Sequence, residues 1–296
     1  MNIKESILRY RRYLKRKNCA ELTIKNYLHR LKSFASWVAV PIEDASPEEA
    51  KMYIDFLLEK GLMPHSINCH LSSVRGFYDY LRDEQGLILE NPVIQGLMLR
   101  EAHPLPRYLR DHDVELFLES ITSTRDRAII MLMLRCGLRV QEVANLTLDA
   151  IDYQRSQIVV RHGKGGKDRI VYISDDAATA LAEYLRNRLI TNEQRIFLVE
   201  IGQYKGNPVS VRAIQKRVEY YAKKSGVHVT AHRLRHTMAT QLLNANADLV
   251  SIQQILGHSK IKTTQRYTKL SNNKAQRDYF QAMEIVMERT TCNQLE

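Results

Sequence analysis

The sequence predicts a mainly α-helical protein with a small antiparallel β-sheet, built as an N-terminal helical bundle followed by a mixed α+β domain. Apolar residues recur at helical spacing along most of the chain. Short β-prone segments flank a glycine-rich loop in the second half, and prolines interrupt the helical pattern near residue 100. The length of 296 residues also suits two domains of ordinary size.

Residues 1–91 form the expected helical domain. Apolar stripes at helical spacing run from Ile24 to Trp37 and from Ile67 to Leu81. Between them, Ser46 is followed by a proline and, three positions on, by Glu49, which is typical of a capped helix N-terminus. We expect a bundle of about four helices, and a linker over residues 92–107 where prolines cluster.

Residues 108–296 form the expected mixed domain. The apolar run Ile129–Leu134 predicts a buried helix that ends at Gly137. Two β-prone segments, 157–160 and 169–173, predict a hairpin around the glycine-rich stretch 162–168. Further helices are expected over 176–190, 209–225, 233–245, 248–256 and 263–267, with a helical tail over about 272–290.

Composition excludes several classes of protein. Hydrophobic residues make up 44% of the chain, too many for a disordered one. No apolar window is long enough for a membrane helix or a secretory signal, so we expect no membrane partner and a cytoplasmic protein. The four cysteines lie far apart, in a pattern that fits neither a disulfide framework nor a zinc site.

The net charge of +11 indicates a polyanionic partner, and nucleic acid is the commonest one. A cationic enzyme with a solvated surface is the alternative. One helix-sized segment near the N-terminus concentrates bases that suit contacts to DNA phosphates, and a solvated face is the alternative. These candidate DNA-binding residues are Arg9, Arg11, Arg12, Lys15, Arg16 and Lys17.

Several motifs of the second domain carry polar side chains suited to chemistry. His232 and His236 have the spacing of a zinc-protease pair, but Arg233 occupies the position where that motif needs glutamate, so we expect no metal site. The glycine-rich stretch does not match a phosphate-binding P-loop, so we expect no nucleotide cofactor. Taken singly, Arg139 with Glu142, the loop Lys164 and Tyr267 also suit ordinary surface roles.

Taken together and in order, the motifs resemble those of the tyrosine recombinase (phage integrase) family, and the two-domain chain resembles its Xer-type members. The resemblance is carried by Gly-Leu-Arg-Val-Gln-Glu at 137–142, His-Arg-Leu-Arg-His-Thr at 232–237, Leu-Gly-His-Ser at 256–259 and Thr-Thr-Gln-Arg-Tyr at 263–267. It covers most of 107–270 and is looser over 1–90. The matching catalytic positions are Arg139, Lys164, His232, Arg235, His258 and Tyr267.

The resemblance implies an enzyme that cuts and rejoins DNA through a 3′-phosphotyrosyl intermediate and a Holliday junction, without metal, ATP or another cofactor. It implies that Tyr267 is the nucleophile and that Arg139 and Arg235 bind the nonbridging oxygens of the phosphate. The other implied roles are proton transfer by His232, protonation of the leaving 5′ oxygen by Lys164, a hydrogen bond from His258 to the phosphate, and orientation by Glu142.

The resemblance also implies a C-shaped clamp of both domains around double-stranded DNA at specific recombination sites. Family members assemble as tetramers in the synapse through a C-terminal tail, and docking of this tail in cis or in trans stays open. Accessory DNA-binding proteins are further expected partners, whereas the arm-binding domain of larger phage integrases is expected to be missing. Transposon or plasmid resolution, integration and dimer resolution all fit. Type IB topoisomerase activity and a non-catalytic DNA-binding module are the alternatives.

Overall fold

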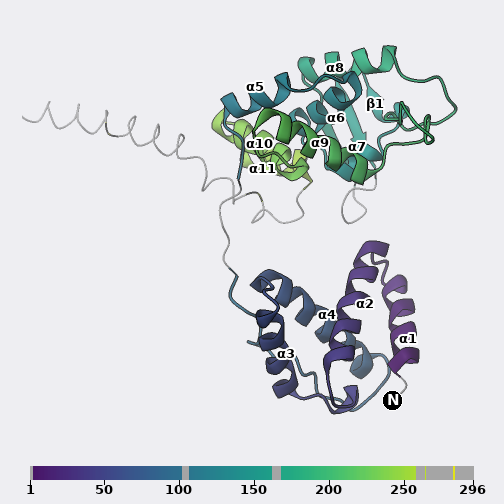
Figure 1. Ribbon diagram of the computed structural model, residues 1–296, viewed down its shortest axis with the longest axis vertical. Helices are drawn as coiled ribbons and strands as arrows, with labels where there is room; N and C mark the ends of the chain where they lie inside the picture. The colour runs from purple at the N-terminus through teal and green to yellow at the C-terminus, as the bar shows by residue number, and fades with distance from the viewer. Residues whose placement is uncertain (1–2, 102–106, 162–167, 258–263, 265–282, 284–296) are drawn as a thin grey trace, which may run out of the picture. The chain divides into compact units, whose positions relative to one another are not determined.

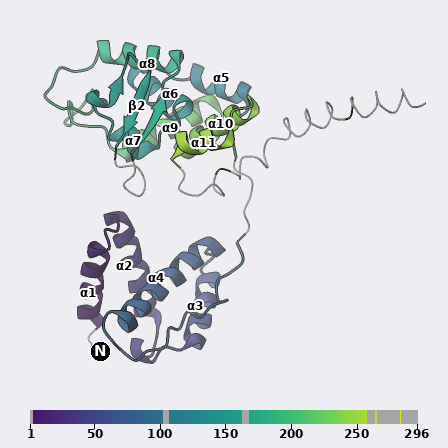
Figure 2. The same ribbon diagram turned by 180° about the vertical axis from the view of Figure 1, so that it is seen from behind.

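The computed structural model describes residues 3–101, 107–161, 168–257, 264 and 283. The chain forms two compact units, Met1–His103 and Pro104–Glu296, drawn from two sides in Figures 1 and 2. The described residues are mainly helical and include one three-stranded antiparallel sheet, which confirms the predicted fold class. Among the helices described, none combines the length and the apolar character of a membrane span.

The described part of the first unit contains four α-helices and one short 3-10 helix, as its apolar stripes predict. Their bounds are α1 (Ile3–Arg16), α2 (Glu21–Trp37), η1 (Ile42–Asp44), α3 (Pro47–Glu59) and α4 (Pro64–Asp83). The expected cap of α3 is present: the Ser46 hydroxyl accepts from the backbone N–H of Glu48 at 3.2 Å, and Glu49 accepts the Ser46 N–H at 2.8 Å.

A group of aromatic side chains lies in the core of the first unit. Tyr10 of α1 packs against Phe77 and Tyr80 of α4, with ring centroids 5.3 and 5.1 Å apart. The buried Tyr78 hydroxyl donates a hydrogen bond of 2.6 Å to the carbonyl of Ile42. The cluster holds α1, α2 and α4 together, so α1 presents its basic residues from a fixed scaffold.

The first part of the expected linker, residues 92–101, is fastened to α4. Asn68 donates to the backbone carbonyl of Leu99 at 2.9 Å and accepts its N–H at 2.8 Å. Arg75 donates to the carbonyl of Val93 at 3.0 Å. Because these hydrogen bonds satisfy the backbone of an otherwise irregular stretch, it keeps one path along the helix.

The second unit surrounds α6, whose residues Ile129–Leu134 are buried as the apolar run predicts. The helix packs against α8 and α10 (Figure 1), and Gly137 follows it with a φ of +65°. The helical bounds are α5 (Asp111–Glu119), α6 (Thr124–Arg135), α7 (Val140–Ala144), η2 (Leu148–Ala150), α8 (Asp175–Arg186), α9 (Val211–Ser225), α10 (Ala231–Asn244) and α11 (Leu249–Leu256).

The sheet has the order β1–β2–β3, with strands Ile151–Asp152, Gln157–Val160 and Arg169–Tyr172 (Figure 2). The pairing of β2 with β3 is antiparallel, in the register Val159 opposite Ile170, which confirms the predicted hairpin strands. The side chains of Ile158, Val160 and Val171 face the core and are buried. The expected hairpin tip with Lys164 lies outside the described residues.

One expected helix is shorter in the structure, and two others fall almost wholly outside the described residues. The helix expected over 176–190 ends at Arg186, because Asn187 leaves the helical conformation, and asparagine competes with helical backbone bonding through its own side chain. Apart from Thr264 and Met283, the helices expected over 263–267 and 272–290 lie outside the described residues.

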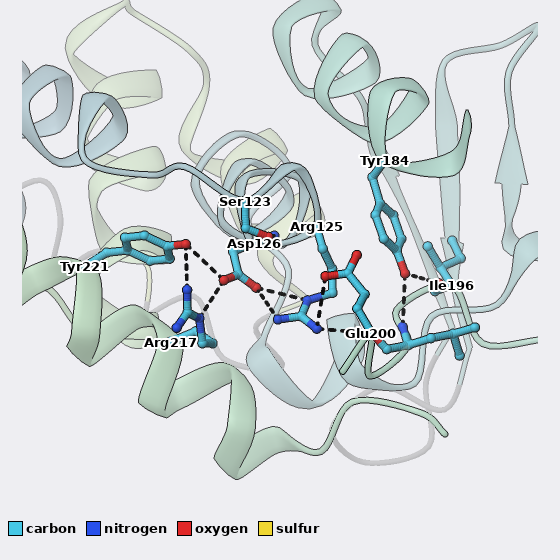
Figure 3. A network of polar contacts seen from close by, with 9 residues as sticks. Ser123, Arg125, Asp126, Tyr184, Ile196, Glu200, Arg217 and Tyr221 are labelled. Carbon is cyan, nitrogen blue, oxygen red and sulfur yellow. Dashed lines mark hydrogen bonds and ion pairs between the residues drawn. The ribbon is translucent and has the colours of Figure 1, made fainter. Parts of the chain in front are cut away.

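Helix α9 is tied to α6 by a buried polar cluster, shown in Figure 3, which we call the Asp126 cluster. It consists of Asp126, Arg125, Arg217 and Tyr221. The Asp126 carboxylate is 1% exposed and accepts hydrogen bonds from Arg125 at 2.8 Å, from Arg217 at 2.6 Å and from the Tyr221 hydroxyl at 3.1 Å. A buried carboxylate needs such partners, and here they fix the position of α9 on the domain.

Candidate active site

Arg139 is positioned by the turn that follows α6. The turn begins at Gly137, and Arg139 then occupies the position just before α7. Glu142 holds Arg139 there, because its carboxylate accepts the backbone N–H of Arg139 at 2.7 Å and the Nη1 of the same residue at 2.9 Å. The guanidinium of Arg139 is therefore held by a residue of its own helix, while 23% of the side chain stays exposed.

His232 and Arg235 lie three positions apart near the start of α10, so they share one side of this helix. The helix begins at Thr230, whose hydroxyl accepts the backbone N–H of Arg233 at 3.1 Å. Elsewhere on α10, the Thr237 hydroxyl accepts the N–H of Leu109 at 2.9 Å. The Arg235 side chain is almost fully buried, at 2% exposure, whereas His232 is exposed.

The carboxyl end of α11 brings the two arginines together. Arg139 donates to the carbonyl of Leu256 at 3.2 Å, and Arg235 donates to the same carbonyl and to that of Gly137. The last carbonyls of a helix lack partners within it and carry partial negative charge, so they attract guanidinium groups. The helix ends where Gly257 turns the chain with a φ of +59°, in the left-handed conformation that glycine commonly adopts after a helix.

Arg139, His232 and Arg235 line one cavity of about 1000 Å³ between α7, α9 and α10. Three polar residues of α9, spaced four positions apart, form another part of its wall: Gln215, Glu219 and Lys223. Their four-residue spacing places them along one side of α9, facing the cavity.

Glu142 lies between two arginines, and one of them, Arg169, was missed by the sequence analysis. The two terminal nitrogens of Arg169 each donate to a different oxygen of Glu142 at 2.7 Å. Burial raises the pKa of Glu142, but hydrogen bonds and positive charge from Arg169, and then from Arg139, outweigh it and lower the pKa to about 2. Glu142 is therefore an anion at neutral pH.

The sequence offered only a weak signal for Arg169. It opens a β-prone segment directly after the glycine-rich stretch, where a charged side chain ordinarily faces solvent. Its side chain is instead 9% exposed. Its partner Glu142 is 27 positions away, and such a pairing depends on how β3 packs against α7 and α11 rather than on local spacing.

The remaining predicted site residues divide into two groups. Lys164, His258 and Tyr267 lie outside the described residues; Lys164 belongs to the segment between β2 and β3, and His258 directly follows Gly257. The six bases near the N-terminus lie in α1 and beyond its end, all exposed. Within the described part of the chain, no group of three His, Cys, Asp or Glu side chains is placed to hold a metal ion.

Comparison with known proteins identifies the family of this chain. Residues 107–274 match the phage integrase family, and residues 7–85 match the phage integrase N-terminal SAM-like domain. The chain is 33% identical to tyrosine recombinase XerA of Thermococcus kodakarensis over 270 residues, which is 90% of this chain and 91% of the relative.

Two further comparisons point the same way. Tyrosine recombinase XerC of Bacillus subtilis is 31% identical over 294 residues, covering 94% of this chain and 96% of the relative. A structure of the Tn1549 transposon integrase in complex with transposon right end DNA has a TM-score of 0.78 at 21% identity, covering 96% of this chain and 100% of that one, and shows the shared fold. The chain therefore belongs to the phage integrase family and is a tyrosine site-specific recombinase.

Proposed function

We propose that this chain cuts and rejoins double-stranded DNA at specific recombination sites through a 3′-phosphotyrosyl intermediate and a Holliday junction. The observation that carries the proposal is the convergence of Arg139 and Arg235 on the carbonyl of Leu256, beside His232 in one cavity. The names of the relatives, which are tyrosine recombinases, support the same activity.

The proposed reaction transfers a phosphoryl group between two oxygens. The Tyr267 oxygen forms a bond to the scissile phosphorus while the bond from phosphorus to the 5′ oxygen breaks. His232 takes the phenol proton, and Lys164 gives a proton to the leaving 5′ oxygen. The attack builds negative charge on the nonbridging oxygens, where Arg139 and Arg235 donate hydrogen bonds and His258 adds another.

The same step run in reverse rejoins a strand, with a 5′ hydroxyl attacking the phosphotyrosyl bond. The bond energy of the phosphodiester is kept in the phosphotyrosyl link, so the exchange consumes no ATP and needs no cofactor. Glu142 takes no part in the bond changes. It remains ionised and accepts hydrogen bonds from the backbone N–H and the guanidinium of Arg139.

Duplex DNA is the proposed partner of both units. The exposed bases at the N-terminus suit phosphate contacts: Arg9, Arg11, Arg12, Lys15, Arg16 and Lys17. Two of them, Arg11 and Lys15, reach Glu21 only at 3.5 and 3.9 Å, and exposed pairs of this kind contribute little, so DNA phosphates can replace them. Affinity that rests on such contacts falls steeply with salt. The expected clamp around the duplex stays a prediction.

We further propose that four copies assemble on two duplexes in the cytoplasm, through the tail over about 272–290. The apolar spacing of that tail is compatible with docking on a neighbouring subunit and with docking on its own domain. Accessory DNA-binding proteins would act on this assembly from outside, and the biological role among resolution, integration and dimer resolution is left to the identity of the target site.

A nicked duplex tests the nucleophile. The wild-type chain first selects a target from a randomised duplex library, and a nick is then placed beside the cleavage position so that the cut strand diffuses away and the covalent adduct accumulates. We expect a denaturant-resistant protein–DNA adduct with the wild type and none with Tyr267→Phe, while both bind the duplex equally. An adduct with both proteins, or with neither, would contradict the assignment.

A plasmid carrying two selected sites separates the alternatives. A recombinase changes which flanking sequences are joined, whereas a type IB topoisomerase only relaxes the supercoils, and a DNA-binding module without chemistry changes neither. Exchange of the flanking sequences is the result we expect. Relaxation without exchange would overturn the proposed function in favour of the topoisomerase.

A further inference from the structure

Arg169, the first residue of β3, joins two elements of the candidate active site. Its terminal nitrogens hold both oxygens of Glu142 on α7 at 2.7 Å, and its Nε donates to the carbonyl of Ile255 on α11 at 2.8 Å. A planar guanidinium suits this task because it presents several N–H groups in fixed directions. One side chain thereby fixes the distance between α7 and the carboxyl end of α11.

The two elements that Arg169 joins, α7 and the carboxyl end of α11, carry the groups that hold Arg139 and Arg235. The Glu142 oxygen that accepts from Arg169 Nη1 also accepts from Arg139. The carbonyl next to that of Ile255, which belongs to Leu256, accepts from Arg139 and from Arg235. A shift of Arg169 would therefore move the acceptors of both arginines at once.

The backbone closes tightly over Arg169. A methyl group on the Cα of Gly257 would lie 2.8 Å from the Cδ of Arg169, closer than van der Waals contact allows. The guanidinium is already held by Glu142, so the side chain could not retreat without breaking those bonds. The end of α11 is thus shaped around this arginine, one residue before His258.

We infer that Arg169 is a positioning residue for DNA strand cleavage, which holds Arg139 and Arg235 in the geometry that grips the scissile phosphate. The inference rests on the proposed function. Arg169 does not line the cavity that contains Arg139, His232 and Arg235. Its effect on the reaction therefore passes through Glu142 and the end of α11 rather than through contact with DNA.

The first test compares Arg169→Gln and Arg169→Lys with the wild type on the selected, nicked duplex. We expect Arg169→Gln to lower the rate of adduct formation about 10- to 100-fold, by analogy with the loss of residues that orient metal ligands. Arg169→Lys should lose less, because an ammonium keeps the charge and one contact but not the paired geometry. The thermal midpoint should fall, because the buried Glu142 carboxylate keeps only one of its two guanidinium partners. The dissociation constant for the duplex, measured well below that midpoint, should stay near wild type.

A matched control removes the same charge at the other end of the sheet. Arg155 lies in the turn between β1 and β2, its side chain is 77% exposed, and its nearest carboxylate oxygen, on Asp152, is 3.9 Å away. Arg155→Gln should cleave at the wild-type rate. The control shows whether loss of one positive charge from this part of the domain is enough to slow the reaction.

Two modified substrates separate positioning of the arginine pair from other effects. A methylphosphonate at the scissile position lacks one charged nonbridging oxygen, so it demands less of Arg139 and Arg235. A 5′-phosphorothiolate has a leaving group that needs no proton, so it bypasses Lys164. We expect the rate ratio between wild type and Arg169→Gln to shrink on the methylphosphonate and to persist on the phosphorothiolate.

Three outcomes would overturn the inference: wild-type cleavage by Arg169→Gln, loss of duplex binding by the folded variant in proportion to its loss of cleavage, or recovery on the phosphorothiolate, which would place Arg169 on the leaving-group side. In each of these three outcomes the wild type still forms the covalent adduct, so the proposed function stands. Failure of the wild type itself to form any adduct would instead refute the proposed function, and the inference with it.

Discussion

Two carboxylates of the second unit, Asp126 and Glu142, each lie between two guanidinium groups. Asp126 is bound by Arg125 and Arg217, and Glu142 by Arg139 and Arg169. Both side chains are largely buried, at 1% and 10% exposure. A buried carboxylate requires partners of this kind, so burial and pairing alone do not distinguish the two clusters.

The clusters differ in what their arginines do with their other donors. In the Asp126 cluster, Arg125 reaches the carbonyl of Leu198 at 3.2 Å and Arg217 reaches the Tyr221 hydroxyl at 2.7 Å, so both point back into the fold (Figure 3). In the other cluster, Arg139 lines the cavity. The same arrangement fastens two helices in one place and holds a cation at the wall of a cavity in the other, where we propose that the scissile phosphate binds.

The largest expected effect would come from Arg139→Ala. Loss of a guanidinium that stabilises a phosphoryl-transfer transition state costs about 10³–10⁵ in rate, so adduct formation should fall by that order while duplex binding persists. Arg125→Ala is the matched variant from the Asp126 cluster, and it should cleave at the wild-type rate per folded molecule. Equal losses in the two variants would erase the distinction between the clusters.

Asp126→Asn should produce the opposite pattern. Removing the charge leaves two arginines facing each other at a buried position, and breaking such a group costs about 3 kcal/mol, toward the low end for buried pairs because the Arg217 side chain is 39% exposed. Hydrogen exchange of α6 and α9 amides would measure this loss in the second unit. The fluorescence of Trp37, the one tryptophan in the chain, reports the first unit and should not change.

The Asp126→Asn result also bears on cleavage. At a temperature where the variant stays folded, adduct formation should match the wild type, because no member of the Asp126 cluster lines the candidate active site. Slower cleavage by Asp126→Asn without a loss of stability would show that the position of this cluster affects the cavity through α9. The proposed division between a cluster that stabilises the fold and a cluster that positions an active-site arginine would then be wrong.

The Glu142 side of the comparison can be tested by acid. The pKa of Glu142 is lowered from 4.5 to about 2 in the folded chain, so its contribution to stability is complete above about pH 4.5 and is lost as pH falls through about 2. Between about pH 5 and about pH 3, the wild type should lose about 2 kcal/mol more than Glu142→Gln, at about 1.4 kcal/mol per pKa unit.

The free energy of unfolding of the second unit is measured for both proteins at the two pH values, by hydrogen exchange of its amides in increasing urea. Glu142→Gln is isosteric and cannot ionise, so it removes only the titration of this side chain. Parallel loss of stability in the two proteins would mean that Arg139 and Arg169 do not hold the carboxylate as an anion, and the support assigned to the arginine pair would fall.

Local patterns in the sequence predicted most of the fold and part of the site. The Ser46 cap, the buried run in α6 and the helix end at Gly137 follow from spacing and residue type, because each depends on near neighbours in the chain. The shared side of His232 and Arg235 follows for the same reason. The structure places both in one cavity with Arg139.

The long-range contacts could not be predicted in this way. Arg169 meets Glu142 and Ile255 across separations of 27 and 86 positions, and Arg139 meets Leu256 across 117. Each contact depends on how whole elements pack, and an arginine at the start of a β-prone segment has no local feature that names its partner. The same holds for Asp126 and Arg217, which are 91 positions apart.

The smallest expected effect isolates the hydroxyl of Tyr221. This group donates to Asp126 at 3.1 Å and accepts from Arg217 at 2.7 Å, so Tyr221→Phe removes two hydrogen bonds from the Asp126 cluster without removing a charge or the buried ring. The expected loss of unfolding free energy in the second unit is about 1–2 kcal/mol, because the carboxylate keeps both arginines. Cleavage should not change. A loss of stability as large as that of Asp126→Asn would show that the hydroxyl, rather than the ion pairs, holds α9 on α6. The Asp126 cluster would then not be held together by its two arginines, as the comparison with Glu142 assumes.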